Sequence, residues 1–322
     1  MRVLVTGAFG RLGEEVLRRL VDEGRGAVAF DVDTRANRRA ARRFGTSIRT
    51  VFGDIRDPAD VEAAVRGVDA VIHDAGILAP MTETHPELAY AVNVEGTQHL
   101  LAAMARRNPA PRLVYASTFS VCGPRRPGLP PLTAEDPAIG TDHYTTHKTR
   151  CEALIRESSV PWTIFRISVS VSAQAKDFSP DIFRLLFGID PKTRVEYVHP
   201  RDVALAQVRA TKTDEALGKT LMIGGGEACR MTFKDFYAAI FEASGVGELP
   251  VEAYGDRPYY CDWVDSTESQ SILRYQQHTF DDFIREFRHA SRRTRPLVKL
   301  FSPAIRRYLL RYSDAWQARG RG

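Results

Sequence analysis

The stretch TGAFGRLG, residues 6–13, decides the fold of this chain. Its glycines at positions 7, 10 and 13 follow the apolar run RVLVT (2–6) and open a segment with helical periodicity. A glycine-rich turn between a first strand and a helix lets a pyrophosphate approach backbone N–H groups at the positive end of that helix. In this context we expect a dinucleotide-binding fold, whereas the glycines alone would indicate only a tight turn.

Short β-branched runs alternate with helical segments over the first 225 residues. Further strands are expected at 27–33, 48–54, 68–76, 112–118, 162–169 and 219–225. Helices are expected at 10–24, 59–67, 88–107, from about residue 144, and at 201–211, with a polar helix or loop at 35–45. Because parallel strands need crossovers, this alternation predicts an α/β fold: a Rossmann-type doubly wound parallel sheet with a smaller C-terminal substrate-binding region.

The pattern weakens after residue 171 and divides the chain into three parts. Residues 1–171, with 198–224 returning to them, are expected to form the dinucleotide-binding Rossmann domain. Residues 172–197 and 225–284 would form the substrate-binding region, in close contact with the sheet because no flexible linker intervenes. Residues 285–322 form a basic tail with eleven Lys/Arg and two Asp/Glu, a net +9, whereas the other 284 residues (34 Lys/Arg, 38 Asp/Glu) carry −4.

The tail contains an amphipathic segment, SPAIRRYLLRYSDAW (302–316), for which Ser302 is the expected helix cap and Pro303 the first helical residue. The residues expected on one apolar face are Ile305, Tyr308, Leu309, Tyr312 and Trp316. We favour packing of this face against the acidic body or a second subunit, with docking on an anionic membrane as the alternative. Nucleic-acid binding is disfavoured because a basic tail carries no readout module.

Composition limits the class of protein. The 43% apolar and 26% charged fractions are ordinary for a globular chain of 322 residues. No run of 18 apolar residues and no secretory signal pattern are found, so we expect a cytoplasmic protein, with peripheral membrane contact through the tail as the alternative. The four cysteines lack metal-site spacing, so we expect free thiols and no metal.

Asp31 ends the second expected strand, 18 residues after Gly13. A carboxylate at this place accepts hydrogen bonds from ribose hydroxyls and repels a 2′-phosphate, which favours NAD over NADP. Arg35, Arg38 and Arg39 follow and could hold that phosphate instead, but we favour a solvated helix face.

A second informative stretch is YTTHK, residues 144–148, which follows VYASTFSVCG (114–123). Spacing of four places Tyr144 and Lys148 on one helix face. Taken alone they could be an exposed pair; beside the glycine loop we interpret them as a proton-transfer pair. A nearby ammonium and an oxidised nicotinamide ring are expected to lower the pKa of the phenol from about 10. Tyr144 would then take a hydroxyl proton while hydride leaves the same carbon, with Thr118 holding the substrate oxygen.

These motifs together resemble the extended short-chain dehydrogenase/reductase family, in its NAD-dependent epimerase/dehydratase group. The matching pieces stand in the family's order: TGAFGRLG, GDIRD, VDAVIHDAG, YAVNVEGTQHLL, VYAST, VCG, YTTHK, EYVHPRDVA, IGGGE and DSTESQSIL. They span residues 3 to about 284 and leave the tail uncovered.

The resemblance implies roles for individual residues. Thr118, Tyr144 and Lys148 correspond to the family's catalytic hydroxyl residue and its Tyr-x-x-x-Lys pair. The implied cofactor-binding residues are Gly7, Phe9, Gly10, Arg11, Leu12, Gly13, Asp31, Asp54, Ile55, Ala75, Gly76, Asn93, Ser117, Tyr144, Lys148 and Ile167. The family also implies a homodimer through the helices that hold residues 90–101 and 144–148.

Departures from the family narrow the reaction. Phe119 and Ser120 follow Thr118 where sugar 4,6-dehydratases carry an Asp-Glu pair, so dehydration is disfavoured. Val169 stands where many nucleotide-sugar enzymes have Asn. Three cations could bind phosphates or could be scattered surface charges: Arg184, Lys192 and Arg194. Three aromatic residues could line the substrate site or could pack in the smaller region: Tyr259, Tyr260 and Trp263.

We therefore expect an NAD-dependent oxidoreductase or epimerase that acts on a sugar, nucleotide-sugar or related secondary alcohol by hydride transfer, with tyrosine as acid/base. The alternative is a non-catalytic dinucleotide-sensing regulatory or scaffold protein of the same fold. Retention of the Tyr144 and Lys148 pair argues for the enzyme.

Overall fold

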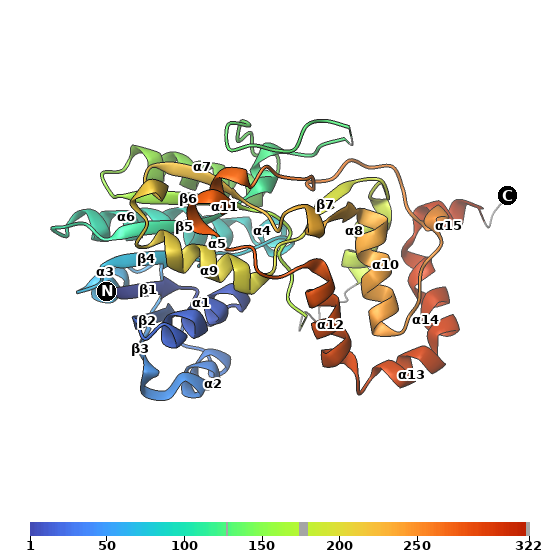
Figure 1. The fold of residues 1–322 in the computed structure, drawn as a ribbon, viewed down its shortest axis with the longest axis horizontal. Coiled ribbons are helices and arrows are strands. Elements are labelled where there is room, and N and C mark those ends of the chain that lie inside the picture. Colours follow the sequence, from blue (N-terminus) through green and yellow to red (C-terminus); the bar gives the residue numbers. More distant parts are fainter. Residues whose placement is uncertain (127, 174–179, 320–322) are drawn as a thin grey trace.

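A seven-stranded parallel sheet forms the centre of the molecule in this computed structural model, which describes residues 1–126, 128–173 and 180–319 (Figure 1). Its strands are β1 (Arg2–Thr6), β2 (Gly26–Asp31), β3 (Ile48–Phe52), β4 (Ala70–His73), β5 (Arg112–Thr118), β6 (Trp162–Ile167) and β8 (Lys219–Ile223). They pair in parallel in the order β3-β2-β1-β4-β5-β6-β8. This confirms the expected doubly wound α/β fold.

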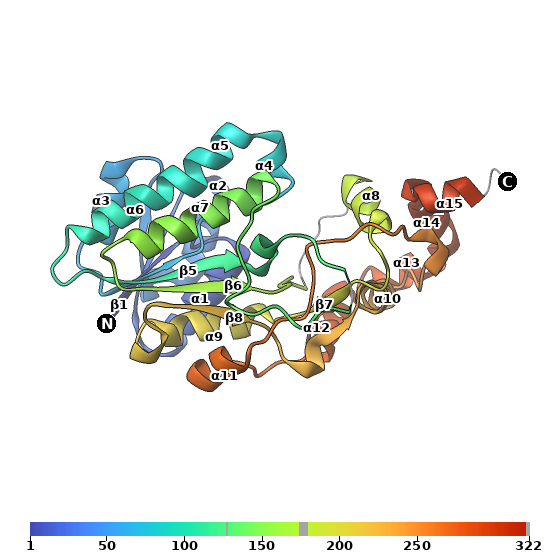
Figure 2. The ribbon, with the colours of Figure 1, turned by 90° about the horizontal axis from the view of Figure 1, so that it is seen from above.

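Helices cover both faces of the sheet (Figure 2). One face carries α1 (Arg11–Asp22), α9 (Pro200–Ala210) and α11 (Thr267–Leu273), and the other carries α3 (Pro58–Val65), α6 (Gly96–Ala105) and α7 (His143–Glu157). The shorter helices α2 (Arg35–Phe44), α4 (Met81–Thr84) and α5 (Pro86–Tyr90) belong to the same half of the chain. The segment expected as a polar helix or loop at 35–45 is thus a helix.

Successive side chains along each strand point to opposite faces of the sheet, so two separate hydrophobic cores form. In β1, Val3 and Val5 pack under α1 and α9, and Leu4 points to the opposite core under α3 and α6. Successive strand residues face opposite sides, so a strand buried on both sides is apolar throughout, as RVLVT is from Val3 to Val5. All three residues are fully buried.

The helix expected at 88–107 contains an irregularity. Between α5 and α6, residues Ala91–Glu95 form a π-helical turn. A π turn inserts one residue into the helix and often occurs at functional sites. Asn93 lies at its centre.

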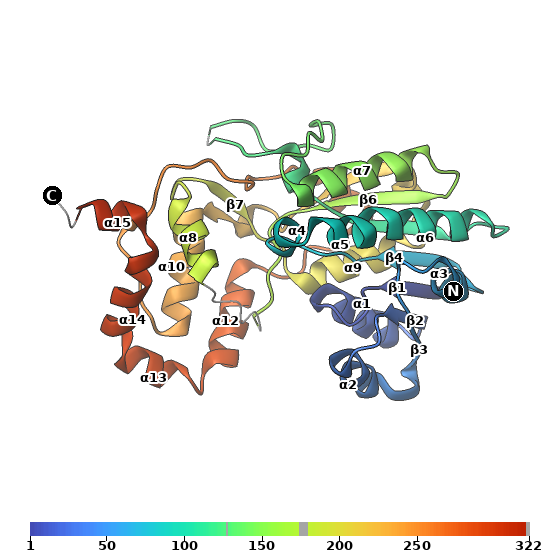
Figure 3. The same ribbon diagram turned by 180° about the vertical axis from the view of Figure 1, so that it is seen from behind.

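A third core lies beyond the carboxyl ends of the strands (Figures 1 and 3). Its elements are α8 (Pro180–Gly188), the antiparallel pair β7 (Arg194–Glu196) and β9 (Arg230–Thr232), α10 (Phe233–Ser244), α12 (Phe280–Ser291), α13 (Arg295–Leu300), α14 (Ser302–Leu309) and α15 (Asp314–Arg319). Its interior is rich in aromatic side chains, among them Tyr197, Phe236 and Phe283. Residues 174–179 of the expected substrate region and 320–322 of the tail lie outside the described residues.

The tail differs from its expectation in three ways. The boundary expected between 284 and 285 falls inside α12. Ser302 is the first residue of α14, without a side-chain capping bond. The helix expected over 302–316 breaks at buried Ser313, whose hydroxyl donates to the Ala253 carbonyl at 2.5 Å and accepts from Trp316 N at 3.0 Å. Of the expected apolar face, Leu309 is buried and Ile305 and Tyr312 pack partly buried against the third core.

Candidate active site

The carboxyl ends of β1, β2, β3 and β4 border one cavity of about 460 Å³, which we call the glycine-loop pocket. Expected cofactor residues that line it are Gly7, Phe9, Gly10, Asp31, Asp54, Ile55, Ala75 and Gly76. Lining residues that the sequence analysis did not select are Phe30, Val32, Asn37, Gly53, Arg56, Asp74, Ile77, Leu88 and Val92. The pocket lies where the strand order reverses between β1 and β4, the usual ligand crevice of an open α/β sheet.

The glycines of the loop leave no room for side chains. Gly7 has φ +64°, and a Cβ on Gly13 would lie 2.3 Å from the Gly7 carbonyl oxygen and 2.8 Å from Ala8 Cα. α1 begins directly after Gly10 with no side-chain cap, so the backbone N–H groups of its first turn are not satisfied by a cap. Such groups at a helix N-terminus suit a diphosphate.

Asp31 stands at the end of β2 inside the pocket. Its carboxylate accepts from Phe9 N at 2.9 Å, from Val32 N at 2.8 Å and from Asn37 Nδ2 at 3.1 Å. Burial raises the pKa of Asp31, and these hydrogen bonds lower it. Of the three nearby arginines, Arg38 is held by Asp33 at 2.6 Å.

The three expected catalytic residues belong to two elements, with Thr118 on β5 and Tyr144 and Lys148 on α7. Thr118 ends β5, and α7 begins just before Tyr144 under a capping box of Asp142 and Thr145. Lys148 is 5% exposed; its Nζ donates to the Ala116 carbonyl at 2.6 Å and lies 4.7 Å from the centre of the Tyr115 ring.

Lys148 does not line the glycine-loop pocket itself but lies close to Gly76, which does. A Cβ added to Gly76, which lines that pocket, would lie 3.9 Å from Lys148 Nζ and 3.2 Å from Asn93 Oδ1. Asn93 accepts from Ile77 N at 2.7 Å and donates to the Ile77 carbonyl at 2.9 Å, so it fixes the loop after β4. Asn93 and Lys148 thus flank the same loop.

The pKa of Tyr144 is raised in the chain by itself. Burial and, to a smaller extent, Asp142 raise the pKa of the Tyr144 phenol to about 12, while the Thr118 side chain acts to lower it. Burial also lowers the pKa of Lys148. In the chain by itself, removal from water outweighs the interaction that lowers the pKa of Tyr144. The expected lowering also depends on the oxidised nicotinamide ring, so it stays a prediction.

Ser117 has a different environment from Thr118. Its hydroxyl donates to Glu152 Oε1 at 2.6 Å, and Glu152 is bound by Arg166 at 3.0 Å. Arg11 is exposed, Leu12 and Ile167 are half-buried against a sheet core, and Gly13 packs against the loop backbone. These five expected cofactor residues are not among those that line the glycine-loop pocket.

Asp74 is the pocket residue whose chemistry the sequence analysis missed. Its Oδ1 accepts from Gln207 Nε2 on α9 at 2.6 Å, and its buried Oδ2 has no hydrogen-bond partner among the described residues. Burial raises the pKa of Asp74 to about 7, while Gln207 and Lys148 act to lower it. The residue stands in VIHDAG, but its partner is 133 positions away, so no local motif could have paired them.

A buried histidine connects the glycine loop to the π turn. His73 Nδ1 lies 2.7 Å from Thr6 Oγ1, and His73 Nε2 lies 3.0 Å from Thr97 Oγ1. Because the Thr97 hydroxyl donates to the Asn93 carbonyl at 2.6 Å, it can only accept from His73, which fixes the proton on Nε2. Burial lowers the pKa of His73 to about 3, so the ring is neutral.

A second cavity, of about 220 Å³, begins at the residues after Thr118. We call it the aromatic pocket; its lining is Phe119, Ser120, Val169, Leu186, Val195, Phe233, Phe236, Tyr237, Tyr259, Tyr260 and Cys261. Ser120 Oγ donates to the Tyr260 carbonyl at 3.3 Å, and Thr141 donates to the Tyr260 hydroxyl at 3.0 Å. Two of the three expected aromatic residues line it; the third, Trp263, lies instead under the guanidinium of Arg194 at 4.8 Å.

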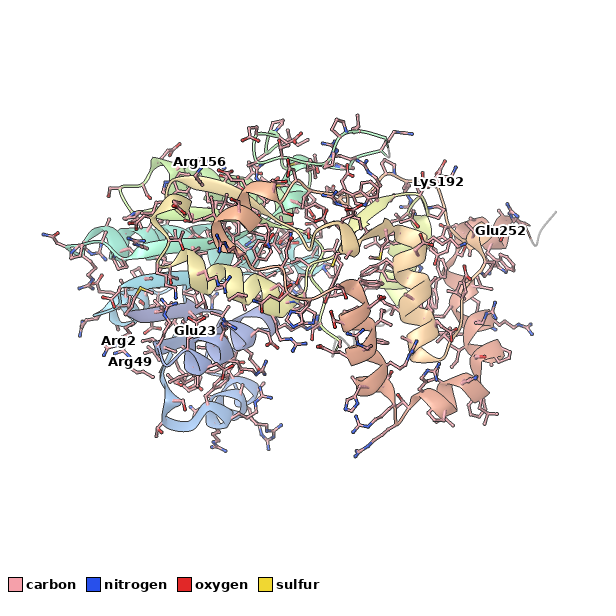
Figure 4. The ribbon with its side chains drawn as sticks, in the orientation of Figure 1. Arg2, Glu23, Arg49, Arg156, Lys192 and Glu252 are labelled. Carbon is pink, nitrogen blue, oxygen red and sulfur yellow. The ribbon has the colours of Figure 1, made fainter. Side chains whose placement is uncertain are left out.

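The three candidate phosphate-binding cations are dispersed. Arg194 forms an ion pair with Asp262 at 2.6 Å. Arg184 lies over the Tyr312 ring at 5.4 Å. Lys192 is exposed at the outer edge of the C-terminal region (Figure 4).

Neither a metal-binding cluster nor a membrane-spanning helix is found in residues 1–126, 128–173 and 180–319. Within these ranges no group of three or more His, Cys, Asp or Glu is arranged to hold a metal ion. No helix there has the length and apolar character needed to cross a membrane.

Comparison with known proteins identifies relatives of this chain. A model described as the 3-beta hydroxysteroid dehydrogenase/isomerase family matches residues 4–161. Short-chain dehydrogenase/reductase family 42E member 1 of Bos taurus is 30% identical over 312 residues, 88% of this chain and 77% of that protein. 3 beta-hydroxysteroid dehydrogenase type 7 of Rattus norvegicus is 30% identical over 163 residues, 48% of each chain, so this chain spans about half the length of that relative.

A solved structure agrees with the fold over nearly the whole molecule. UDP-glucose-4-epimerase of Stenotrophomonas maltophila, with bound NAD and formylated UDP-arabinopyranose, is similar with a TM-score of 0.75 at 23% identity, covering 91% of this chain and 99% of that chain. At this identity the likeness establishes the fold. With the similarity to the Bos taurus protein over most of both lengths, it confirms the resemblance inferred from the motifs: the chain belongs to the short-chain dehydrogenase/reductase family, as one of its extended members.

Proposed function

We propose that this enzyme binds NAD and transfers hydride between it and a secondary alcohol or the corresponding ketone, with Tyr144 as the proton-transferring group. The observation that carries this proposal is that Thr118 ends β5 and that Tyr144 and Lys148 lie at the start of α7, with Lys148 Nζ 3.9 Å from a Cβ built on the pocket residue Gly76. The bound nicotinamide supplies or accepts the hydride.

The residues of the glycine-loop pocket fit this cofactor. Gly7 and Gly10 leave backbone open to a diphosphate at the start of α1, and the Asp31 carboxylate can accept from ribose hydroxyls. Asp54 and Ile55 border the adenine end in this proposal. Arg35, Arg38 and Arg39 do not line the pocket, and Arg38 is engaged by Asp33, which supports NAD over NADP.

The high pKa of Tyr144 suits reduction. A phenol with a pKa near 12 is protonated at neutral pH and can donate to the oxygen of a ketone as hydride reaches the carbon. Thr118, whose side chain acts on the pKa of Tyr144, can hold that oxygen in line. In the oxidative direction Tyr144 must accept a proton, so the rate should rise with pH.

The aromatic pocket supports an apolar substrate. Its lining consists mainly of Phe, Tyr, Val and Leu side chains and starts at Phe119, directly after Thr118. The cations expected for a nucleotide diphosphate give less support, since Arg194 is paired with Asp262 and Lys192 stands at the outer edge. We therefore favour a ring alcohol or ketone with few polar groups over a nucleotide sugar. The Rattus norvegicus relative is named a 3 beta-hydroxysteroid dehydrogenase, and a hydroxysteroid is a ring alcohol of this class.

The test is a screen of two groups of compounds: apolar cyclic alcohols and ketones, and UDP-sugars. Turnover is measured by NADH absorbance or by product analysis. We expect turnover with a member of the first group and a loss of about 100- to 10,000-fold in kcat for Tyr144→Phe, with NADH binding retained. Tyr90→Phe, the same change on α5, is the control and should keep full activity.

NADH binding without turnover on any compound, and no difference between the two variants, would favour the sensing or scaffold protein. A homodimer through α6 and α7 stays a prediction, which light scattering on the purified protein would test.

A further inference from the structure

The last helices of the chain expose a cluster of large apolar side chains. Leu297, Leu300 and Phe301 are 61%, 73% and 54% exposed and lie at the turn from α13 to α14. Within the described part of the chain, Leu300 is the most exposed large apolar residue. We call these three residues the apolar corner. A contiguous exposed apolar cluster of this kind marks an interaction site more often than a scattered single residue does.

Cations lie on both sides of the apolar corner. Arg288, Arg292, Arg295, Pro296 and Lys299 line an open groove of about 340 Å³ between α12 and α13. Pro303, Arg306, Arg307, Leu310, Arg311, Trp316 and Gln317 line another of about 600 Å³ between α14 and α15. Arg295 approaches Glu242 at 3.7 Å. The other six cations of these two grooves form no ion pair with a carboxylate of residues 1–126, 128–173 or 180–319.

The packing of α13 and α14 leaves the apolar corner and its flanking cations exposed to solvent. Val298, Ile305 and Leu309 point into the third core, so the opposite sides of α13 and α14 stay free. α13 forms an outer edge of the molecule between α12 and α14 in two opposite views (Figures 1 and 3). Ser313 ties the end of this segment to Ala253 at 2.5 Å.

We propose that the apolar corner and its flanking cations dock on an anionic lipid bilayer. A bilayer interface presents phosphates and hydrocarbon at adjacent depths, and the exposed surface presents arginines and lysine beside Leu300 and Phe301. Nucleic acid would satisfy the cations and leave the apolar corner in water. A second copy docking by the same face would bring two strongly basic segments together, since residues 285–322 carry a net +9.

Helix α10 connects the proposed docking surface to the aromatic pocket. α10 supplies Phe233, Phe236 and Tyr237 to the aromatic pocket, and it packs against α12 and α13. The bilayer would therefore lie one helix away from a pocket lined by apolar side chains. The docking itself does not depend on the proposed reaction.

The experiment is vesicle flotation of the full chain. We expect binding to phosphatidylcholine vesicles that contain phosphatidylglycerol, little binding to pure phosphatidylcholine, and release by salt. Leu300→Ser/Phe301→Ser and, separately, Arg292→Glu/Lys299→Glu should each weaken binding by at least about tenfold. All four side chains are exposed, so both variants should keep the thermal unfolding midpoint.

Two control variants carry equivalent substitutions at sites outside the proposed docking surface. Arg39→Glu/Arg42→Glu removes the same charge from α2, and Leu129→Ser/Leu185→Ser removes two exposed apolar side chains outside the region 285–319. Both controls should float like the parent chain. Failure of the parent chain to float, or equal losses in test and control variants, would overturn the proposal. Tighter binding to an RNA or DNA oligonucleotide than to anionic vesicles, or a dimer that Leu300→Ser/Phe301→Ser dissociates, would also overturn it.

Discussion

The Ser117 hydroxyl donates to Glu152 Oε1 at 2.6 Å, whereas Thr118, the next residue of β5, accepts from Ser120 N at 3.2 Å and acts to lower the pKa of the Tyr144 phenol. Successive residues of a strand face opposite sides, so two adjacent hydroxyls enter two different environments. Ser117 belongs to a buried ion pair that joins α7 to β6 through Glu152 and Arg166. In the proposed reaction, Thr118 holds the substrate oxygen.

Substitution of the two hydroxyls should separate stability from turnover. Ser117→Ala leaves a Glu152 oxygen without that partner and should lower the free energy of unfolding by about 1–3 kcal/mol, with kcat/KM nearly unchanged. Thr118→Ala should lower kcat on the order of 100-fold, and Thr118→Ser should restore most of it. Urea unfolding and steady-state kinetics measure both effects. An equal loss of turnover in Ser117→Ala and Thr118→Ala would contradict the division.

Gly13→Ala should disrupt the glycine loop. The new Cβ would lie 2.3 Å from the Gly7 carbonyl oxygen, a backbone atom that cannot move without deforming the loop. We expect NADH affinity to fall by at least about tenfold and the free energy of unfolding to fall by about 1–3 kcal/mol. Gly26→Ala is the control, since its Cβ would find its nearest neighbours at 3.6 Å. NADH fluorescence titration and thermal unfolding provide the readouts; normal NADH binding by Gly13→Ala would contradict the assigned role of the loop.

The sequence correctly predicts the strands and the loop whose structure depends on neighbouring residues. β1 and β5 occupy the runs RVLVT and RLVYAST as expected, because each run is apolar and bounded by polar or turn residues. The glycine loop was found for the same reason: its spacing and its place after a strand are both local.

Features set by distant contacts could not be read from the sequence. Gln207 reaches Asp74 across 133 positions, and Ser313 breaks the last helix by binding Ala253, 60 positions earlier. The pKa of Tyr144 in the chain by itself depends on burial, which pattern alone does not supply. The π turn at Asn93 is likewise hidden within an ordinary helical pattern.

Asp31→Asn should weaken discrimination against NADP. The amide keeps one acceptor oxygen but removes the negative charge that opposes a 2′-phosphate, so the ratio of kcat/KM for NAD to that for NADP should fall by about tenfold or more. Asp69→Asn removes the same charge at the opposite end of the sheet, just before β4, and should leave the ratio unchanged. An unaltered ratio in Asp31→Asn would show that Asp31 does not select the cofactor.

Asp74 should make the stability of the free enzyme depend on pH. Burial raises its pKa to about 7 in the folded chain, against about 3.9 when unfolded. Between these values the folded state binds more protons than the unfolded state, so the free energy of unfolding decreases as pH rises from about 4 to 7 and then levels. Below pH 4 the carboxyl is protonated in both states and this contribution does not change.

Asp74→Asn removes the ionisation while keeping an oxygen that can accept from Gln207. The variant should therefore gain stability relative to the parent chain between pH 5 and pH 8, on the order of 2 kcal/mol, as measured by urea unfolding of the cofactor-free protein at the two pH values. Asp256→Asn replaces an exposed aspartate and should show no such gain. If Asp74→Asn and the parent chain keep the same stability difference at both pH values, the carboxyl is ionised throughout, and solvent or Lys148 must compensate its charge in the folded enzyme.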